Sequence, residues 1–85
     1  MAIFTDKDLE IVVRLVDQVK TDSSHLTNID TRLMEDAAID SLSLIDVVDA
    51  VQQETEVTFL PEDYSFEKLQ SVRSIVLLVG ERRGH

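Results

Sequence analysis

The chain has 85 residues, with 17 Asp and Glu against 8 Lys and Arg, which gives a formal net charge of −9. This length allows one domain with a thin core, and the charge argues against nucleic acid and anionic membranes as partners because both would be repelled. The absence of cysteine excludes disulfides, thiolate catalysis and sulfur-based zinc sites, while two glycines, one proline and 5% aromatic residues favour helices over a sheet.

No run of about 18 apolar residues is present, so we expect no membrane span. The first residues, MAIFTDKD, lack the basic start and the apolar run of a signal peptide. Together with the missing cysteine, these features fit a cytoplasmic protein. We expect a single domain over residues 1–85, with a folded core at about 6–79 and a flexible tail at 80–85.

A first helix is predicted from about Asp6 to Lys20. Thr5 and Asp8 have the spacing of a capping box, and Phe4 is placed to pack on Leu9 as a hydrophobic staple. Apolar residues recur at helical spacing along one stripe, which predicts the face that packs on the core. The stripe consists of Leu9, Val12, Val13, Val16 and Val19.

Residues 21–36, TDSSHLTNIDTRLMED, form a long polar connection. A loop of this length is unusual in a compact domain. Apolar residues are spaced through it, so we expect it to lie over the core like a strap, with a short turn at 30–32. These apolar residues are Leu26, Ile29, Leu33 and Met34.

A second helix is predicted from about Ser41 to Glu54, with two distinct faces. The core face consists of Leu44, Val47, Val48 and Val51. The opposite face, to which Ser41 lies nearer, consists of Leu42, Ile45, Asp46, Asp49 and Gln53. Two large apolar side chains among carboxylates suit a partner with an apolar spot ringed by Lys or Arg. The alternative is that Leu42 and Ile45 pack under the preceding loop.

Ser41 stands where this helix begins, and its simplest role would be the N-cap. In that case Leu44 would occupy the partner position of the capping box, and leucine cannot take part in it. Asp40 is an equally good cap, and its charge suits the positive helix end. With Asp40 as the cap, the hydroxyl of Ser41 is left free, in a place where a phosphate ester is electrostatically favoured.

Pro61 begins a short turn or helix in the stretch PEDYSFEKL, since proline is favoured at a first helical position. A last helix is predicted to start at Ser71 as its N-cap and to end at Gly80, followed by a frayed ERRGH tail. The predicted fold is therefore all-α: a small bundle of three main helices plus one short helix, with a long loop between the first and second helices.

The run Asp40-Ser41-Leu42, followed by an aliphatic helix with surface acids, resembles the acyl carrier proteins. The amphipathic first helix, the loop ending in LMED and the segment FEKLQSVRSIVLLV at the matching distance extend this resemblance over about residues 6–79. It implies that a phosphopantetheinyl transferase attaches a 4′-phosphopantetheine arm covalently to Ser41. The arm would hold acyl groups as thioesters.

The resemblance also implies a chain that catalyses nothing itself, acts as a monomer and is visited by acyl-loading and acyl-processing enzymes with basic docking patches. The partner contacts expected from it are Asp40, Leu42, Ile45, Asp46 and Asp49. Ile39-Asp40 before the serine favours an acyl cargo, of a polyketide, fatty-acid-like or related specialised pathway. A free-standing peptidyl or aminoacyl carrier, and an acidic helical interaction domain with an unmodified Ser41, are the alternatives.

The sequence departs from the family pattern at two places. Ala38 stands where the family often has Gly, and Ala37 where it often has Leu, so we expect the turn into the second helix to differ in shape. Gln52 and Gln53 stand where many carriers have further acids, so partners are expected to rely less on charge.

Other sites find little support in the sequence. His25 and His85 lack the spacing of a metal pair, and the acids of the second helix lack the glycine and alternating oxygen ligands of a calcium loop. We therefore predict no metal site and no catalytic residues. A set of apolar residues on the second and last helices is either plain core or the lining of an acyl cavity: Val47, Val51, Ile75 and Val79.

Overall fold

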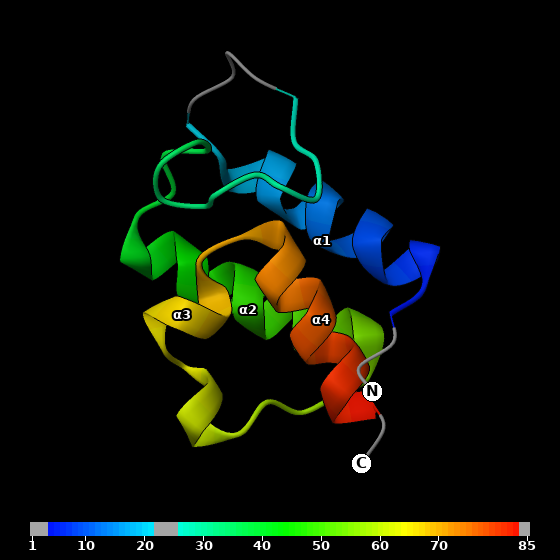
Figure 1. The fold of residues 1–85 in the computed structure, drawn as a ribbon. Helices are drawn as coiled ribbons and strands as arrows, with labels where there is room; N and C mark the ends of the chain where they lie inside the picture. Colours follow the sequence, from blue (N-terminus) through cyan, green and yellow to red (C-terminus); the bar gives the residue numbers. More distant parts are fainter. Residues whose placement is uncertain (1–3, 22–25, 84–85) are drawn as a thin grey trace.

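The computed structural model describes residues 4–21 and 26–83. In chain order its elements are α1 (Asp6–Val19), α2 (Ser41–Thr55), the 3₁₀ turn η1 (Pro61–Asp63), α3 (Phe66–Leu69) and α4 (Val72–Arg83), as Figure 1 shows. Over these residues no strand is formed, although an isolated antiparallel bridge joins Arg32 to Ser71. The predicted all-α fold, with three main helices and one short helix, is confirmed. No helix in these ranges is long and apolar enough to cross a membrane.

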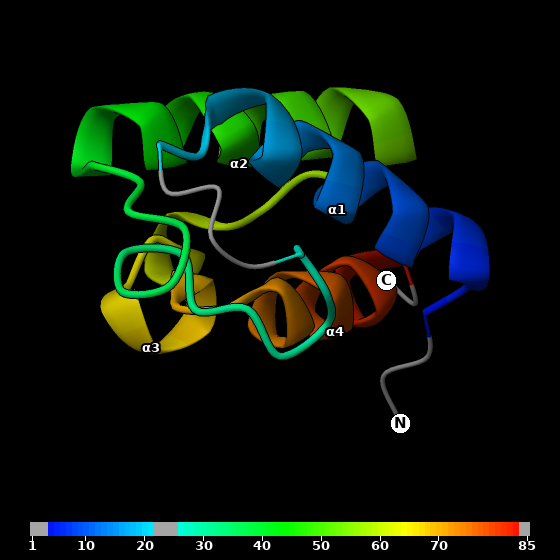
Figure 2. The ribbon, with the colours of Figure 1, turned by 90° about the horizontal axis from the view of Figure 1, so that it is seen from above.

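The helices enclose one aliphatic core. Two views at right angles show α2 on one side and α4 with α3 on the other (Figures 1 and 2), and α1 contacts both α2 and α4. The predicted core face of α2 is buried, and the residues considered for an acyl cavity belong to the same buried cluster: Val47, Val51, Ile75 and Val79. On α1, Ile11 and Leu15 are buried in addition to Val12 and Val16, because a helix that packs on two others buries a wider stripe.

The start of α1 forms as predicted. Thr5 Oγ1 accepts a hydrogen bond from the Asp8 N–H at 3.1 Å, and Asp8 Oδ2 accepts one from the Thr5 N–H at 3.0 Å. This capping box satisfies two backbone donors that the first helical turn would otherwise leave unpaired. The helix ends at Val19, one residue before the predicted end, because Lys20 has extended backbone angles.

The connection between α1 and α2 is held by its backbone more than by its apolar side chains. The N–H of Leu33 donates to the Gln70 carbonyl at 2.9 Å, and the carbonyl of Thr31 accepts from Val72 N–H at 3.0 Å. Of the four apolar residues spaced through it, only Leu33 is fully buried, while Leu26 is 88% exposed. The predicted strap is therefore present, and Leu33 is the one of these four side chains that enters the core.

The prediction that the last helix ends at Gly80 is also wrong. α4 continues through Gly80 to Arg83, and Gly80 is buried within it. A glycine inside a helix costs about 1 kcal/mol relative to alanine. The additional turn places Arg82 against Asp63 and Arg83 against Asp8, and these ion pairs stabilise it. The predicted flexible tail is thus helical at 80–83, and residues 84–85 lie outside the described part of the chain.

Candidate functional site

The entry to α2 is capped by Asp40. Its backbone is extended, and its Oδ1 accepts a hydrogen bond from the Ser43 N–H at 2.8 Å. That hydrogen bond to the ionised form holds the pKa of the Asp40 carboxyl below its usual value. Asp40 is therefore the N-cap, as the sequence predicts, and Ser41 is the first helical residue.

Ser41 is exposed, and its Oγ makes no hydrogen bond to any residue that the structure describes. The hydroxyl lies at the positive end of a helix of 15 residues. The dipole of such a helix favours a negatively charged group at that end. No side chain in residues 4–21 or 26–83 accepts the Ser41 proton, so none of these residues is placed to act as a base for a reaction at this oxygen.

The turn before α2 contains a strained residue. Ala38 has a φ of 53°, in the left-handed region that favours glycine. Neighbouring groups hold it there, since Thr21 Oγ1 donates to the Ala38 carbonyl at 2.8 Å and the Ile39 N–H donates to Leu33 O at 3.0 Å. Alanine thus adopts here a conformation that glycine would take freely, and its presence costs about 1–2 kcal/mol of backbone strain.

The outer face of α2 is apolar and acidic. Leu42 is 80% exposed and Ile45 is 41% exposed, so the alternative in which both pack under the preceding loop is wrong. Asp46 and Asp49 are exposed on the same face. Neither carboxylate has an ion-pair partner in residues 4–21 or 26–83.

The remaining charges explain why this face stays negative. Seven of the eight basic side chains pair with carboxylates elsewhere on the chain: Arg14, Lys20, Arg32, Lys68, Arg73, Arg82 and Arg83. The acids of the outer face of α2 are therefore not neutralised from within the described chain. A partner that carries Lys or Arg would gain these charges without displacing an internal ion pair.

Gln52 has a structural role that sequence reasoning missed. Its Nε2 donates to Tyr64 Oη at 2.8 Å, and its Oε1 accepts from the Phe59 N–H at 2.7 Å. It fixes the segment after α2 by using both ends of its amide, and a carboxylate has no donor with which to repeat this. Gln52 is therefore half-buried and engaged within the fold, whereas Gln53 is exposed.

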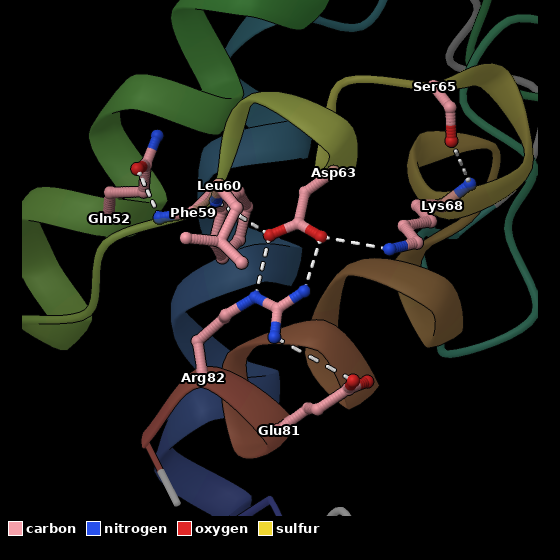
Figure 3. A network of polar contacts seen from close by, with 8 residues as sticks. All are labelled: Gln52, Phe59, Leu60, Asp63, Ser65, Lys68, Glu81 and Arg82. Atoms are coloured by element: carbon pink, nitrogen blue, oxygen red, sulfur yellow. Dashed lines mark hydrogen bonds and ion pairs between the residues drawn. The ribbon is translucent and has the colours of Figure 1, made fainter. Parts of the chain in front are cut away.

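A second structural site that the sequence did not reveal is the network around Asp63, drawn in Figure 3. This carboxylate is fully buried and accepts hydrogen bonds from Arg82 Nε and Nη2, from Lys68 Nζ and from the Leu60 N–H. The Arg82 guanidinium holds the pKa of Asp63 far below its usual value. The network joins η1, α3 and α4, so it fixes the position of the short helix.

The histidines named from the sequence, His25 and His85, lie outside the described residues. Within the described ranges, no group of three or more His, Cys, Asp or Glu side chains could hold a metal ion.

Comparison with known proteins bears on the geometry around Ser41. A family model described as a phosphopantetheine attachment site matches residues 10–79. The match includes α2, the capped turn before it and the strap that leads to that turn. No curated protein matches the chain.

Proposed function

The chain belongs to the phosphopantetheine attachment site family, whose members are carrier proteins that hold 4′-phosphopantetheine covalently on a serine, and we propose that Ser41 is the attachment residue. The observation that carries this proposal is the exposed Ser41 Oγ, without a hydrogen bond in the described chain, at the start of a helix capped by Asp40. The residues around it fit the group, since Ser41 is exposed and the positive helix end favours a phosphodiester.

The other described serines are less suitable. Ser43 is half-buried, and its N–H is bound by Asp40. Ser65 Oγ accepts from the Lys68 N–H and Ser71 Oγ accepts from the Ser74 N–H, so both hydroxyls cap helices. Ser74 Oγ lies 2.9 Å from Ser71 Oγ and shares a hydrogen bond with it. Only Ser41 combines exposure with an uncommitted oxygen among these residues.

The chain contributes the nucleophilic oxygen and a surface on which a transferase can act. Ser41 Oγ gives its proton to the transferase and forms a bond to the phosphorus that carries pantetheine in coenzyme A. The bond from that phosphorus to the rest of the nucleotide breaks, and the nucleotide bisphosphate leaves. The transferase and its magnesium supply the activation, because the described chain offers Ser41 no base. Held on Ser41, the arm would supply a thiol that can carry an acyl group as a thioester.

The outer face of α2 is the proposed docking surface for the enzymes that load and process the cargo. Leu42 and Ile45 supply apolar contact area, and Asp46 and Asp49 attract Lys and Arg of the partner. Asp40 adds its charge but is held by Ser43 as the cap, so its contribution to a partner contact is indirect. Contacts of this kind are weak and brief, which suits a monomeric carrier that visits several enzymes in turn.

The cargo we propose is an acyl group of a polyketide, fatty-acid-like or related specialised pathway, and the support for it is the Ile39-Asp40 sequence before the serine. The chain itself is proposed to be a carrier without catalytic activity. A peptidyl cargo would leave the attachment chemistry unchanged and would alter only the partner enzymes.

Intact-mass spectrometry tests the attachment directly. The protein is incubated with coenzyme A, magnesium and a promiscuous phosphopantetheinyl transferase, and we expect one phosphopantetheine on the wild type and none on Ser41→Ala. Ser43→Ala is the matched control and should be modified like the wild type. An unmodified wild type would instead favour an acidic interaction domain that carries no arm. Addition that persists in Ser41→Ala would place the site elsewhere.

A further inference from the structure

The chain that leaves α1 is hydrogen-bonded to the turn before α2 through one threonine. Thr21 follows shortly after the end of α1, and its N–H donates to the Ala37 carbonyl at 3.0 Å. Its Oγ1 donates to the next carbonyl along the chain, that of Ala38, at 2.8 Å. In both ribbon views the end of α1 lies beside the chain that enters α2 (Figures 1 and 2). Thr21 therefore binds two successive carbonyls of this turn, one with its backbone donor and one with its side-chain donor.

These two carbonyls belong to the peptide groups on either side of the strained residue. Ala38 has a φ of 53°, which alanine adopts only against a steric cost. Each carbonyl lies in a rigid peptide plane, so a return of Ala38 to a negative φ would rotate one plane relative to the other. Because Thr21 is bonded to both planes, its hydrogen bonds oppose this rotation.

The plane after Ala38 is held at its other edge as well. The Ile39 N–H donates to the Leu33 carbonyl at 3.0 Å, and both of these side chains are buried. This contact ties the turn to the core, whereas Thr21 ties it to the end of α1. The strained conformation at Ala38 is thus held from two separate parts of the fold.

The conformation of Ala38 sets how the chain enters α2. Only Ile39 and Asp40 separate Ala38 from Ser41. Ile39 must point into the core, and Asp40 must have an extended backbone for its Oδ1 to accept from the Ser43 N–H at 2.8 Å. If Ala38 relaxes, the chain is redirected before these two residues, and we expect the cap to loosen and the first turn of α2 to fray.

We propose that Thr21 is a positioning residue for the modification of Ser41. Its hydrogen bonds keep Ala38 in the left-handed conformation, and this holds the first turn of α2 in the orientation in which the transferase meets the Ser41 hydroxyl. Thr21 acts through the backbone of the turn and not by contact with the reacting atoms. The inference rests on the proposed attachment at Ser41.

Steady-state kinetics of the apo protein with coenzyme A, magnesium and a promiscuous phosphopantetheinyl transferase test this role. Thr21→Val removes the hydroxyl but keeps the shape, and should lower kcat about fivefold, the effect of one hydrogen bond. The KM should stay within about twofold, because the proposed docking residues Ile45, Asp46 and Asp49 lie beyond the first turn. Thr21→Ser keeps the hydroxyl and should retain the wild-type kcat. Thr58→Val, at an exposed threonine after α2, is the matched control and should change neither constant.

Glycine at position 38 distinguishes this role from a general effect on the fold. Glycine adopts a positive φ without steric cost, so the turn no longer needs the hydroxyl of Thr21. Addition of Ala38→Gly to Thr21→Val should return kcat to within about twofold of the wild type. Addition of Ala37→Gly is the control and should leave kcat low, since Ala37 does not have a positive φ. If Ala38→Gly does not restore kcat, the hydroxyl does not act through the strained turn and the proposal is overturned.

Amide hydrogen exchange measured by NMR reports on the turn without the transferase. Thr21→Val should speed exchange at the N–H groups of Ile39 and Ser43 about fivefold, because both hydrogen bonds depend on the path of the turn. The Val72 N–H, which donates to the strap, should be unchanged and show that the fold is intact. If the wild type is modified but Thr21→Val keeps the wild-type kcat and exchange rates, the positioning role is refuted while the attachment at Ser41 stands. If the wild type is not modified, both proposals fail.

Discussion

Arg82 donates both Nε and Nη2 to the two carboxylate oxygens of Asp63, at 2.7 and 2.6 Å, although 19 residues separate the two positions. This bidentate pair ties the last turn of α4 to η1, and Lys68 extends it to α3 at 2.9 Å. A buried carboxylate therefore fixes how η1, α3 and the last turn of α4 are joined. The same carboxylate sits directly before the exposed Tyr64.

Asp63→Asn tests how much this carboxylate contributes. The amide cannot accept from both guanidinium nitrogens and from Lys68 as a carboxylate does, so Arg82 loses its bidentate partner and keeps only the longer contact with Glu81 at 3.7 Å. We expect a loss of about 3 kcal/mol in the free energy of unfolding, because removal of one partner from a buried pair costs about that much. Chemical denaturation measures it. Asp30→Asn, which breaks the exposed pair with Arg73, is the control and should change stability little. Equal effects of the two substitutions would contradict the special role of Asp63.

The pH dependence of the same contribution has a definite sign. The pKa of Asp63 is lowered in the folded state, since Arg82 favours the ionised form. A carboxyl group with a lowered pKa in the folded state contributes its full stabilisation when the pH is above the ordinary carboxyl pKa of about 4. This stabilisation is lost as the pH falls below that value. The difference in unfolding free energy between the wild type and Asp63→Asn should therefore be largest near neutral pH and shrink below about pH 4. A difference that grows with acidity would refute the assignment.

The sequence predicted the parts of the fold that local patterns encode. Apolar spacing identified the core face of α2, and the Thr5–Asp8 and Asp40 caps were recognisable because capping is decided within three or four residues. The exposure of Leu42 and Ile45 also followed from helical periodicity, although the sequence left open whether a loop would cover them.

What the sequence could not predict depends on contacts between distant residues. Glycine often ends a helix, which is why the sequence predicts an end at Gly80. The helix continues because Arg82 and Arg83 pair with carboxylates that lie 19 and 75 residues away in the sequence. No local pattern links an arginine to an acid so far away. The same reason explains why the sequence does not reveal the structural role of Gln52. Its hydrogen bonds to Phe59 and Tyr64 exist only once the chain after α2 has turned back.

Ala38→Gly should stabilise the protein. At a φ of 53° alanine has a steric cost of about 1–2 kcal/mol in the folded state that glycine avoids. Glycine also increases the conformational entropy of the unfolded chain, which lowers the stability of the folded state by about 0.4–1 kcal/mol. We expect a net gain of about 0.5–1 kcal/mol, seen as a higher midpoint of denaturation. Ala37→Gly is the control, because Ala37 is buried and does not have a positive φ, so it should lose stability. A loss in Ala38→Gly would mean that the turn is not strained.

Reversal of Asp46 and Asp49 to Lys tests electrostatic steering by the outer face of α2. Both carboxylates are exposed and lack ion-pair partners in the described chain, so stability should change by less than about 0.5 kcal/mol. Association with the transferase should slow by at least about tenfold at low ionic strength, because the variant loses two negative charges and gains two positive ones on the face that meets a basic surface. At high ionic strength the difference should fall to about twofold, since surface charges are screened over a few ångströms. Stopped-flow association rates at several salt concentrations measure this, with Asp6 and Glu10 of α1 reversed to Lys as the matched control. Equal slowing by both pairs would show that only net charge matters, and unchanged rates in the α2 variant would refute docking through that face.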